Sequence, residues 1–582
     1  MKIKRTLALL LSLLLCLAAL TACGNTEQGA TPPASDTSQG DQSADAPDGE
    51  VDDESDVDTD EMKTIVVELF RTTTTDTATE ERLTAAMNEI TEELINVHVD
   101  LNFNSPTDIA TKVSVGIPAG DQMDLMCFNP VGGCTLGTLV AQNQGIDMTA
   151  YLEEYAPQTL ELLEDYLPAT TFDGQIMGVT NLRQLNESFW LTMNADVLEE
   201  LGLTEKAEAC DDWTTYAEIM QEVVDNTDLA GIGPNDGNGS IVENYAFFVG
   251  EEEWSDSFAF DNLGDQYSLI YVDSETDTVM NYYATEEYAY AVEMAHEWYE
   301  AGLVYKDSAI TEQTRDAQIS GNLSFSITGQ GGPATPVNKI ASTQHNVLCK
   351  ELATPVISSS NLIKFGFCMP VTCQEPEAAA KFLELMYTNA DVMNLLLWGE
   401  EGVDWVLNDQ GEACYPEGKD ASSVYHGDED VFPNCYIAYP WEGLGGDFRE
   451  TSWEQLQNTP VSKYVGLSVD TSSVADQITA CYNASQQYRA ILNCGQADPE
   501  TTLPEFLQAL EEAGIPYYMD KREDILTDPL ITLVLSALRA AVDGWDTEDL
   551  LRLMKTGLLP GFTADRIAVL ENYLYMWRIR GN

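Results

Sequence analysis

Apolar strands and helical segments alternate in one part of the 582-residue chain, and this alternation constrains the fold more than any other feature. Residues 63–70, KTIVVELF, form a β-branched apolar run that predicts a buried strand. A helical segment over 81–95 leads into a second predicted strand at 97–103, where apolar and polar residues alternate. A helix near 108–116 and a third strand at 121–128 follow. Strand, helix and strand at this spacing indicate a parallel βαβ unit and therefore an α/β fold.

Further helices are marked by residues that favour helix ends. For the segment ADVLEELG at 195–202, the preceding Asn194 is a good N-cap and the final Gly202 a good terminating residue. Residues 63–514 are long enough for two sizeable α/β lobes, and no repeat of fixed period is visible in them. Three more helices are predicted by the same kinds of signal, at 285–302, from Pro376 onward, and over 504–514 between Pro504 and Gly514.

Charge excludes several classes of protein. The chain has 98 Asp and Glu against 27 Lys and Arg, a net charge of −71, which repels polyanions. We therefore expect no binding of nucleic acid and no docking on anionic lipid headgroups. Hydrophobic residues make up 44% of the chain, enough to form folded cores, and the length suggests two to four domains. No apolar run after residue 22 is long enough to span a bilayer.

The N-terminus has the features of an export signal. Lys2, Lys4 and Arg5 precede the apolar run 7–20, which predicts a secretory signal peptide over residues 1–22. The following Cys23 completes the sequence Leu-Thr-Ala-Cys, which resembles the lipobox of bacterial lipoproteins. The resemblance implies cleavage before Cys23 and lipidation of its thiol. The alternative is an ordinary secretory signal with an incidental cysteine.

The segment that follows the signal is predicted to be an extended tether. Residues 24–62 contain 13 acidic residues and no Lys, Arg or aromatic residue. Such a composition buries too little apolar surface to offset the loss of chain entropy on folding. We expect residues 23–62, with the lipidated Cys23, to hold a folded domain away from a membrane.

The C-terminal end differs from the rest in composition. Residues 515–582 contain eight basic and ten acidic residues and no cysteine, whereas the preceding chain is strongly acidic and holds all twelve cysteines. Three apolar helices are predicted there, at 528–542, 545–554 and 565–577. A change this abrupt indicates a segment of different origin.

Cysteine and histidine patterns point to no metal or catalytic centre. No CxxC or HxxxH spacing occurs, and neither a nucleophile motif nor a phosphate-binding loop is present. We therefore expect no catalytic residue, no metal and no cofactor. Ten cysteines remain after Cys16 and Cys23, and either they are free thiols or some form disulfides. Cys481 with Cys494 and Cys414 with Cys435 are two pairs that could close modest loops.

Several short motifs occur in a fixed order within residues 63–514. They are LEEYAP at 152–157, DGQIMGV at 173–179, WLTMNADVLEELGL at 190–203, WTTY at 213–216, WYEAGLV at 298–304, EPEAAAKFL at 375–383 and WGEEGVDW at 398–405. By the order and spacing of these motifs, residues 63–514 resemble the extracellular solute-binding proteins of bacterial ABC importers, in particular the large sugar-binding type. Two departures from the family pattern are Met177, where an aromatic residue is usual, and the absence of Pro after Val179.

The resemblance implies two α/β lobes joined by crossing strands, with the ligand held in the cleft between them. Sugar rings have apolar faces that lie on aromatic side chains and hydroxyls that need polar partners. We rank Trp441 first, because the neighbouring Pro and Gly residues of AYPWEGLGG place it in a loop. Core packing is the alternative for each single aromatic residue. The candidate ligand-binding residues are Arg71, Asn129, Trp190, Asn244, Tyr245, Gln330, Trp398 and Trp441.

The final segment, residues 515–582, contains the sequences IPYYMDKREDIL and KTGLL. These pieces resemble part of a different family, the B subunit of the bacterial ATP-dependent helicase/deoxyribonuclease. The resemblance covers a fragment of that large protein and includes no nucleotide-binding loop. We interpret the segment as a fusion near Gly514–Pro516, either genuine or created when the gene was assembled. A divergent native helical cap is the alternative.

These features lead to one expected function. We expect a non-enzymatic lipoprotein, anchored on the extracellular face of the cell membrane, that binds a neutral solute such as an oligosaccharide and passes it to ABC permease subunits. A surface carbohydrate-active enzyme, a helicase–nuclease fragment and an adhesion lipoprotein are the alternatives. A hydrolase would need a pair of carboxylates at catalytic separation in a cleft.

Overall fold

The computed structural model describes two parts of the chain. The first spans residues 61–514, apart from 73–74, 132, 234–240, 242–253, 255–260, 266, 274–275, 311–322, 354 and 468–471. The second consists of residues 551, 554–555 and 564–576. Cys23 and the acidic segment before Glu61 lie outside these residues, as do Asn244 and Tyr245. Within the described part, no helix is long and apolar enough to cross a bilayer.

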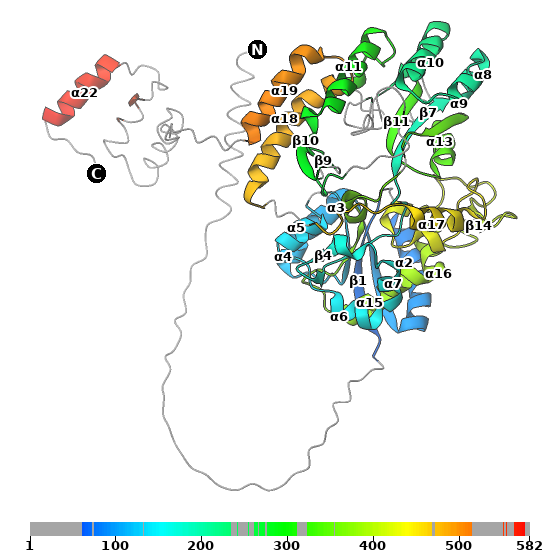
Figure 1. The fold of residues 1–582 in the computed structure, drawn as a ribbon. Helices are drawn as coiled ribbons and strands as arrows, with labels where there is room; N and C mark the ends of the chain where they lie inside the picture. The colour runs from blue at the N-terminus through cyan, green and yellow to red at the C-terminus, as the bar shows by residue number, and fades with distance from the viewer. Residues whose placement is uncertain are drawn as a thin grey trace, which may run out of the picture. The chain divides into compact units, whose positions relative to one another are not determined.

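The first lobe is built on a five-stranded sheet with the strand order β2-β1-β3-β13-β6, of which β1 is labelled in Figure 1. Strand β1 (Lys63–Phe70) pairs in parallel with β2 (Val97–Asn104) and β3 (Leu125–Phe128). Strand β13 (Gly366–Cys368) pairs antiparallel with β3 and with β6 (Val179–Thr180). The predicted βαβ unit is therefore confirmed, and the bounds of β1 match the prediction.

Helix α2 (Thr77–Ile95) connects β1 with β2 and begins earlier than predicted, because the side chain of Asp76 accepts a hydrogen bond from Thr79 N. Its Asn88 side chain donates to Val99 O at 3.0 Å and accepts from Val99 N at 2.6 Å, which fixes the helix against β2. The predicted helix near 108–116 is α3 (Pro106–Thr111) continued by a five-residue π-helical segment, Lys112–Gly116.

The remaining large helices of the first lobe come from later in the chain. Helix α15 (Pro376–Thr388) starts at the predicted proline, and α16 (Ala390–Trp398) follows it directly. Helix α17 (Phe448–Asn458) adds to the same lobe and contributes Leu456 to its core. Both α15 and α16 bury most of their apolar side chains, so they anchor the loops that lead away from α16.

The second lobe is built on a four-stranded sheet with the order β12-β7-β11-β8. Strand β7 (Ser188–Asn194) lies between β12 (Val347–Glu351) and β11 (Leu323–Gly331), antiparallel to both, and β8 (Ala230–Ile232) is parallel to β11. Its helices are α8 (Ala195–Leu201), α9 (Thr204–Glu208), α10 (Trp213–Asn226), α11 (Glu286–Glu300), α13 (Thr335–Thr343), α18 (Ala475–Asn493) and α19 (Pro499–Gly514).

Helix ends in the second lobe test the predicted boundary residues. The Asn194 side chain accepts from Val197 N, and Gly202 ends α8 with a φ of 70°, both as predicted. Helix α11 ends before Gly302, also as predicted. The prediction for Pro504 is wrong, because α19 starts at Pro499 and Pro504 lies inside it. The helix starts five residues earlier, where Asp498 accepts from Thr502 N at 3.0 Å with its backbone carbonyl and from Glu500 N at 2.9 Å with its side chain.

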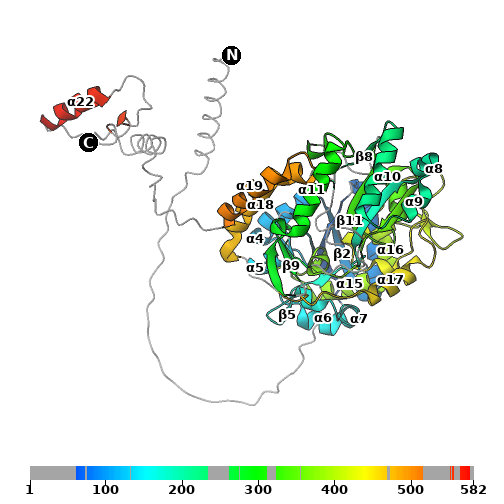
Figure 2. The ribbon, with the colours of Figure 1, turned by 45° about the horizontal axis from the view of Figure 1, so that its top comes forward.

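The two lobes have separate hydrophobic cores, and the chain passes between them three times. One core takes residues from 65–185 and 357–456, and the other from 189–353 and 484–510. Figure 2 shows the two sheets with their covering helices from a second direction. The arrangement confirms the predicted two-lobed α/β fold.

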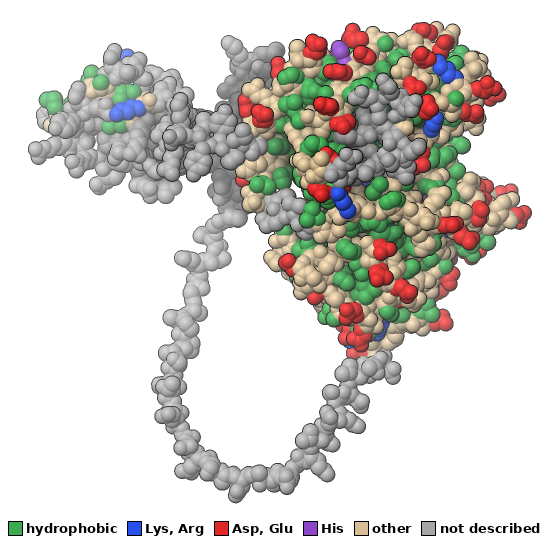
Figure 3. Space-filling view, in the orientation of Figure 1, with side chains coloured by type: hydrophobic (Ala, Val, Ile, Leu, Met, Phe, Trp, Pro, Cys, Tyr) green, Lys and Arg blue, Asp and Glu red, His purple; other side chains and the backbone are tan. Residues whose placement is uncertain are grey.

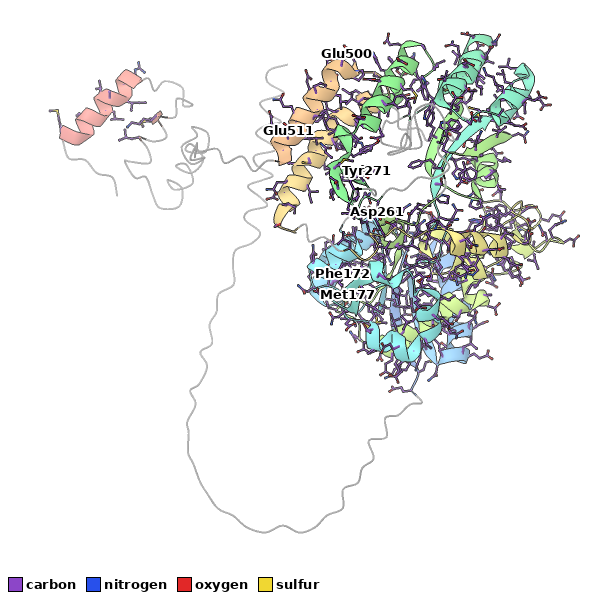
Figure 4. All side chains as sticks on the ribbon, in the orientation of Figure 1. Phe172, Met177, Asp261, Tyr271, Glu500 and Glu511 are labelled. Carbon is purple, nitrogen blue, oxygen red and sulfur yellow. The ribbon has the colours of Figure 1, made fainter. Side chains whose placement is uncertain are left out.

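Hydrogen bonds next to the segments in which the chain passes between the lobes also link the two lobes. Strands β9 (Ile270–Asp273) and β10 (Thr278–Asn281) form a hairpin in the second lobe, close to Asp261, which bridges to Val272. The carboxylate of Asp261, a residue labelled in Figure 4, accepts from Ser359 N at 3.0 Å at the start of α14 (Ser359–Ile363). Tyr464 donates to Asp277 at 2.8 Å in the third crossing segment.

Of the two alternatives for the cysteines, thiols are the one that the structure shows, because no disulfide joins any of the ten described cysteines. Cys481 and Cys494 lie on or directly after the same helix, α18, thirteen positions apart. At about 1.5 Å of rise per residue, this separation is far beyond the reach of a disulfide. Cys414 and Cys435 are likewise unpaired, so neither of the two suggested disulfides is present.

In the C-terminal segment, the third predicted helix is present as α22 (Ala564–Met576). Its side chains at Val569, Tyr573 and Met576 are 69%, 54% and 77% exposed. The two helices predicted at 528–542 and 545–554 fall almost entirely outside the described residues. The described part of the segment therefore shows an apolar helix face that is open to solvent.

Candidate functional site

A cavity of about 710 Å³ opens between the two lobes. The first lobe contributes most of the lining: three residues after β1, two residues of α2, and a larger group from the segment between Trp398 and Leu444. The second lobe contributes Ala334, Thr335 and Asn338 from the start of α13, and the crossing segment contributes Gln184 and Glu187. Ligand sites of proteins commonly have volumes of about 300–1,000 Å³, so the cavity has room for a small oligosaccharide.

Four rings form one wall of the cavity, and we call Trp398, Tyr415, His426 and Trp441 the aromatic platform. The Trp441 ring centroid lies 4.9 Å from that of Trp398, 4.7 Å from Tyr415 and 4.4 Å from His426. Trp398 is almost fully buried, while Trp441 is half-buried. Trp398 therefore supports the platform from behind, and Trp441 is the tryptophan with ring surface available to a ligand.

The backbone around Trp441 is held from both sides. Strand β15 (Ala413–Cys414) donates Ala413 N to Pro440 O at 2.8 Å and accepts Glu442 N at 2.9 Å. The buried Glu412 carboxylate accepts from Gly445 N at 2.7 Å. Hydrogen bonds from Asn408 and then from Gly445 hold the pKa of Glu412 below its usual value. The loop keeps Trp441 in place without a ligand, so little entropy is lost when a sugar binds.

A buried ion pair forms the wall next to the platform. Arg82 of α2 binds the Asp404 carboxylate through two nitrogens, at 2.8 and 3.0 Å, and contacts Glu400 at 3.1 Å. The Asp404 side chain is 3% exposed and also accepts from Tyr425 N at 3.1 Å. Paired, planar contacts of this kind fix the geometry of a guanidinium group. The interaction ties α2 to the loops that carry the platform.

A second ion cluster lies where the chain first crosses between the lobes. The fully buried Arg183 contacts Glu187 at 2.5 Å and Asp430 at 3.4 Å, and donates to Asn361 O at 3.1 Å. Burial raises the pKa of Asp430 to about 6, and the nearby Glu187 and Asp428 charges oppose the lowering effect of Arg183. Burial also works against ionisation of Glu187, but Arg183 prevails and lowers the pKa of that carboxyl.

The cavity has a negative charge balance. Its only cationic lining residues among those described are Arg82, which is paired, and Lys419. Anions are repelled by such a wall, and neutral or cationic ligands are not. Among the charged side chains on the face shown in Figure 3, those of Asp and Glu far outnumber those of Lys and Arg. The acidic lining residues are Asp76, Glu187, Asp404, Asp428, Glu429 and Asp430.

Two of the predicted ligand-binding residues, Trp398 and Trp441, lie together in this cavity. Their role in binding remains a prediction, but the positions are compatible with it. The sequence-based reasoning did not select Tyr415 or His426. The signal that could have found them is the stretch of aromatic, Asp and Gly residues over 415–446, whose composition is typical of a polar loop with exposed rings.

Arg71 and Asn129 do not line the cavity. Arg71 contacts Glu80 at 3.3 Å and donates to Thr75 O at 3.0 Å, so it shapes the loop after β1, whose Thr72 does reach the cavity. Asn129 is fully buried and bonds to Cys127 O at 3.1 Å, which makes it a turn-forming residue after β3. Both side chains are engaged in local pairing, and neither belongs to the wall of this cavity.

The other four candidates fall elsewhere. Trp190 lies in β7 beside Gly331, outside the cavity lining, because a tryptophan ring in that strand packs across the sheet onto the neighbouring glycine. Gln330 belongs to β11, but its side chain lies outside the described residues, as do Asn244 and Tyr245 altogether. Among the residues that the structure describes, no group of three potential metal ligands is close enough to hold an ion.

Comparison with known proteins finds relatives of two kinds. Curated relatives of one kind are B subunits of the ATP-dependent helicase/deoxyribonuclease. The relative from Lachnoclostridium phytofermentans is 42% identical over 72 residues, which is 12% of this chain and 6% of that protein. The chain therefore spans only a small part of these relatives.

Solved structures with the same two-lobed fold are solute-binding proteins. The N-glycan transport solute binding protein NgtS from Streptococcus pneumoniae superposes with a TM-score of 0.65 at 19% identity, covering 78% of this chain and 94% of that one. An extracellular solute-binding protein from Bifidobacterium longum subsp. infantis gives a TM-score of 0.56 at 13% identity, covering 78% and 95%. At these identities the likeness shows the fold.

Sequence comparisons extend over most of the chain. The "Carbohydrate ABC transporter substrate-binding protein" of Streptococcus pneumoniae serotype 4 is 22% identical over 441 residues, which is 75% of this chain and 84% of that protein. A domain of unknown function, DUF3502, matches residues 463–517. The family model described as "Bacterial extracellular solute-binding protein" matches residues 85–398, more than half of the chain. Together with the fold and the cavity between the lobes, this match shows that the chain belongs to the bacterial extracellular solute-binding protein family.

Proposed function

We propose that the protein binds a neutral oligosaccharide in the cavity between its lobes and delivers it to an ABC permease. The observation that carries this proposal is the aromatic platform, which meets hydrogen-bonding groups from both lobes in one cavity. A sugar ring places its apolar face on an aromatic ring and directs its hydroxyls to polar side chains. Thr72, Gln184 and Asn338 supply such polar groups around the platform.

Relatives support an oligosaccharide as the ligand. Two NgtS structures are described as complexes with Man1GlcNAc and with Man5GlcNAc, and a third neighbour, FusA, as a complex with kestose. All three saccharides are uncharged. The acidic lining of the cavity favours the same choice for this chain, because an added carboxylate or sulfate would face six acidic residues.

A test of ligand charge separates this proposal from a site for acidic solutes. The chain from residue 24 onward is titrated by calorimetry with neutral oligosaccharides and with an acidic control, a trimer of galacturonic acid. We expect binding of a neutral oligosaccharide only. Binding of the uronate trimer with no neutral ligand would contradict the proposal.

We also propose that the protein acts without chemical change of its ligand. Each acidic residue that lines the cavity is engaged within the protein: Glu429, for example, binds Arg449 through two oxygens at 2.7 and 2.8 Å. A glycosidase needs one carboxyl free to donate a proton and another free to attack or activate water. A bound oligosaccharide should therefore remain intact for hours, as chromatography of the recovered ligand would show, whereas cleavage products would favour a surface hydrolase.

We propose that lipidated Cys23 anchors the protein on the outer face of the cell membrane. The lipobox-like sequence before Cys23 and the acidic segment over 24–62 support this. Cys23→Ala should release the protein into the medium or leave it unprocessed, because two acyl chains are needed for stable membrane binding. Fractionation of cells and mass spectrometry of the N-terminus measure the outcome. Membrane retention of the processed parent protein with no lipid on residue 23 would rule out this anchor.

We propose that residues 516–582 are a fused segment that takes no part in binding. The DUF3502 match ends at residue 517, close to where the sequence begins to resemble the helicase/deoxyribonuclease. Deleting 516–582 should leave the melting temperature of the two lobes and their ligand affinity unchanged, since its helices would bury less than about 1,000 Å² against them. Calorimetric melting checks this. If the deletion instead lowers the melting temperature by several degrees, the segment is a native helical cap.

A further inference from the structure

His426 differs from the other titratable groups in the wall of the cavity. All six acidic lining residues have hydrogen bonds or ion pairs within the protein; Asp428, for instance, accepts from Thr72 Oγ1 at 2.9 Å. The Nδ1 atom of His426 is enclosed and has no hydrogen-bond partner among the described residues. This leaves Nε2 as the ring nitrogen that can reach the cavity, and no described protein group bonds to it either.

The ring of His426 is nevertheless held firmly. It packs edge-to-face on Trp441, with centroids 4.4 Å apart and planes at 84°, and lies 4.8 Å from Trp398. Tyr425 on one side donates its hydroxyl to Leu396 O at 2.7 Å, and Gly427 on the other donates its N–H to Leu397 O at 2.7 Å. Both anchors belong to helix α16, so the ring keeps its position without a ligand.

Side-chain chemistry then limits what this ring can do. Burial lowers the pKa of His426, against the opposing influence of Glu429 and Asp428, so the imidazole is neutral at pH 7. A neutral imidazole carries one N–H donor and one bare acceptor nitrogen. Because no protein group bonds to Nδ1, nothing fixes the tautomer, and Nε2 can either donate to a hydroxyl or accept from one. A sugar hydroxyl has the same two capacities.

We propose that His426 determines specificity by forming a hydrogen bond from Nε2 to one hydroxyl of the sugar ring that lies on Trp441. The inference rests on the proposed function, because it assigns a contact within the same cavity. A fixed polar group beside a stacking surface distinguishes sugars that carry the hydroxyl in the correct configuration from those that lack it. The ring of Trp441 contributes affinity for any sugar that stacks on it, and His426 determines which of these sugars bind tightly.

The test compares three proteins that start at residue 24: the parent, His426→Phe and His345→Phe. Phenylalanine keeps a flat aromatic ring against Trp441 and removes both nitrogens. His345, which bonds to Asp196 at 3.3 Å outside the cavity lining, is the matched control. The probes are Man1GlcNAc, kestose and maltotriose, followed by the monodeoxy analogues of the saccharide that the parent binds most tightly.

We expect His426→Phe to bind that saccharide about tenfold more weakly, as the loss of one buried hydrogen bond predicts, while His345→Phe binds like the parent. The unsubstituted protein should bind one monodeoxy analogue about tenfold more weakly than it binds the complete saccharide. His426→Phe should bind this analogue and the complete saccharide with affinities within about twofold of each other. This loss of discrimination identifies a direct contact, which a general loosening of the platform would not produce.

Three results would overturn the inference. If the parent protein and His426→Phe discriminate equally well among the analogues, a residue other than His426 binds the hydroxyl. The proposed function then stands without this contact. If no probe binds the parent, the proposed function fails together with the contact. If His426→Phe fails to melt cooperatively, His426→Gln replaces it; glutamine keeps a donor and an acceptor, and binding reduced more than about tenfold would contradict the hydrogen bond.

Discussion

Replacing Trp441 by Ala weakens oligosaccharide binding about 10- to 30-fold and leaves the protein folded. Trp441 is the half-buried ring of the aromatic platform, and its removal takes away the surface on which a sugar ring lies. Losses of about 1.4–2 kcal/mol are usual when a tryptophan at the centre of a binding site is truncated. The backbone of the loop should persist, because the bonds of Ala413 and Glu412 do not involve the indole. Calorimetric titration and thermal melting measure the two effects separately.

Trp453→Ala is the matched control for this variant. Trp453 is also half-buried in the first lobe, where it packs on Tyr436 with centroids 5.1 Å apart, and it does not line the cavity. Its replacement should leave ligand affinity unchanged. If Trp441→Ala retains full affinity but loses its cooperative melt, Trp441 is a core residue and the ligand binds elsewhere.

Replacing Arg183 by Met has the largest expected effect on stability. The side chain is fully buried between Glu187 and Asp430, so its loss leaves the two carboxylates with only Lys364, which lies 3.8 Å from Glu187, as a nearby cation. Breaking a buried ion pair from one side typically costs about 3–5 kcal/mol. Urea unfolding followed by tryptophan fluorescence at pH 7.5 measures the change in the free energy of unfolding. Lys206→Met, which removes an exposed ion pair with Glu218, should cost less than about 1 kcal/mol.

The pH dependence of this variant has a definite sign. Without Arg183, burial should raise the folded-state pKa of Glu187 and of Asp430 above their unfolded values, so both carboxyls bind protons more tightly in the folded protein. A raised folded-state pKa contributes stability at pH values below the unfolded pKa, and this contribution is lost as the pH rises. The loss of unfolding free energy caused by Arg183→Met should therefore be smaller at pH 5 than at pH 7.5. An equal deficit at both values would show that lost packing, rather than charge, causes the effect.

Local signals in the sequence predicted much of the fold. Strand β1 was predicted with the bounds Lys63–Phe70, because every interior residue but one is apolar or β-branched and the strand is buried. Asn194 and Gly202 mark the ends of α8 by hydrogen bonding and by a positive φ, both of which are properties of single residues. The Pro504 prediction failed because Pro499 and the capping Asp498, whose carboxylate accepts from Glu500 N at 2.9 Å, start the helix five residues earlier, and the helix continues through Pro504.

The candidate site was less accessible to prediction. Trp441 could be placed in a loop from its Pro and Gly neighbours, which need no long-range contact. Arg71 and Asn129 were predicted because they follow strands, but their pairing with Glu80 and Cys127 depends on the folded backbone. The cavity joins residues as far apart as Thr72 and Leu444. A single sequence carries no direct signal for such contacts, so residues like Arg82 and His426 could be assigned only from the structure.

The most direct test of the central claim, that the cavity is a site for a neutral oligosaccharide, is calorimetric titration of the chain from residue 24 with Man1GlcNAc, kestose and maltotriose, repeated with Trp441→Ala. The account predicts that at least one saccharide binds the parent with one-to-one stoichiometry, raises its stability by about 2.7 kcal/mol at a hundredfold excess over the dissociation constant, and binds Trp441→Ala at least tenfold more weakly. Binding of equal strength to both proteins, or no binding of any neutral saccharide at millimolar concentration, would contradict it.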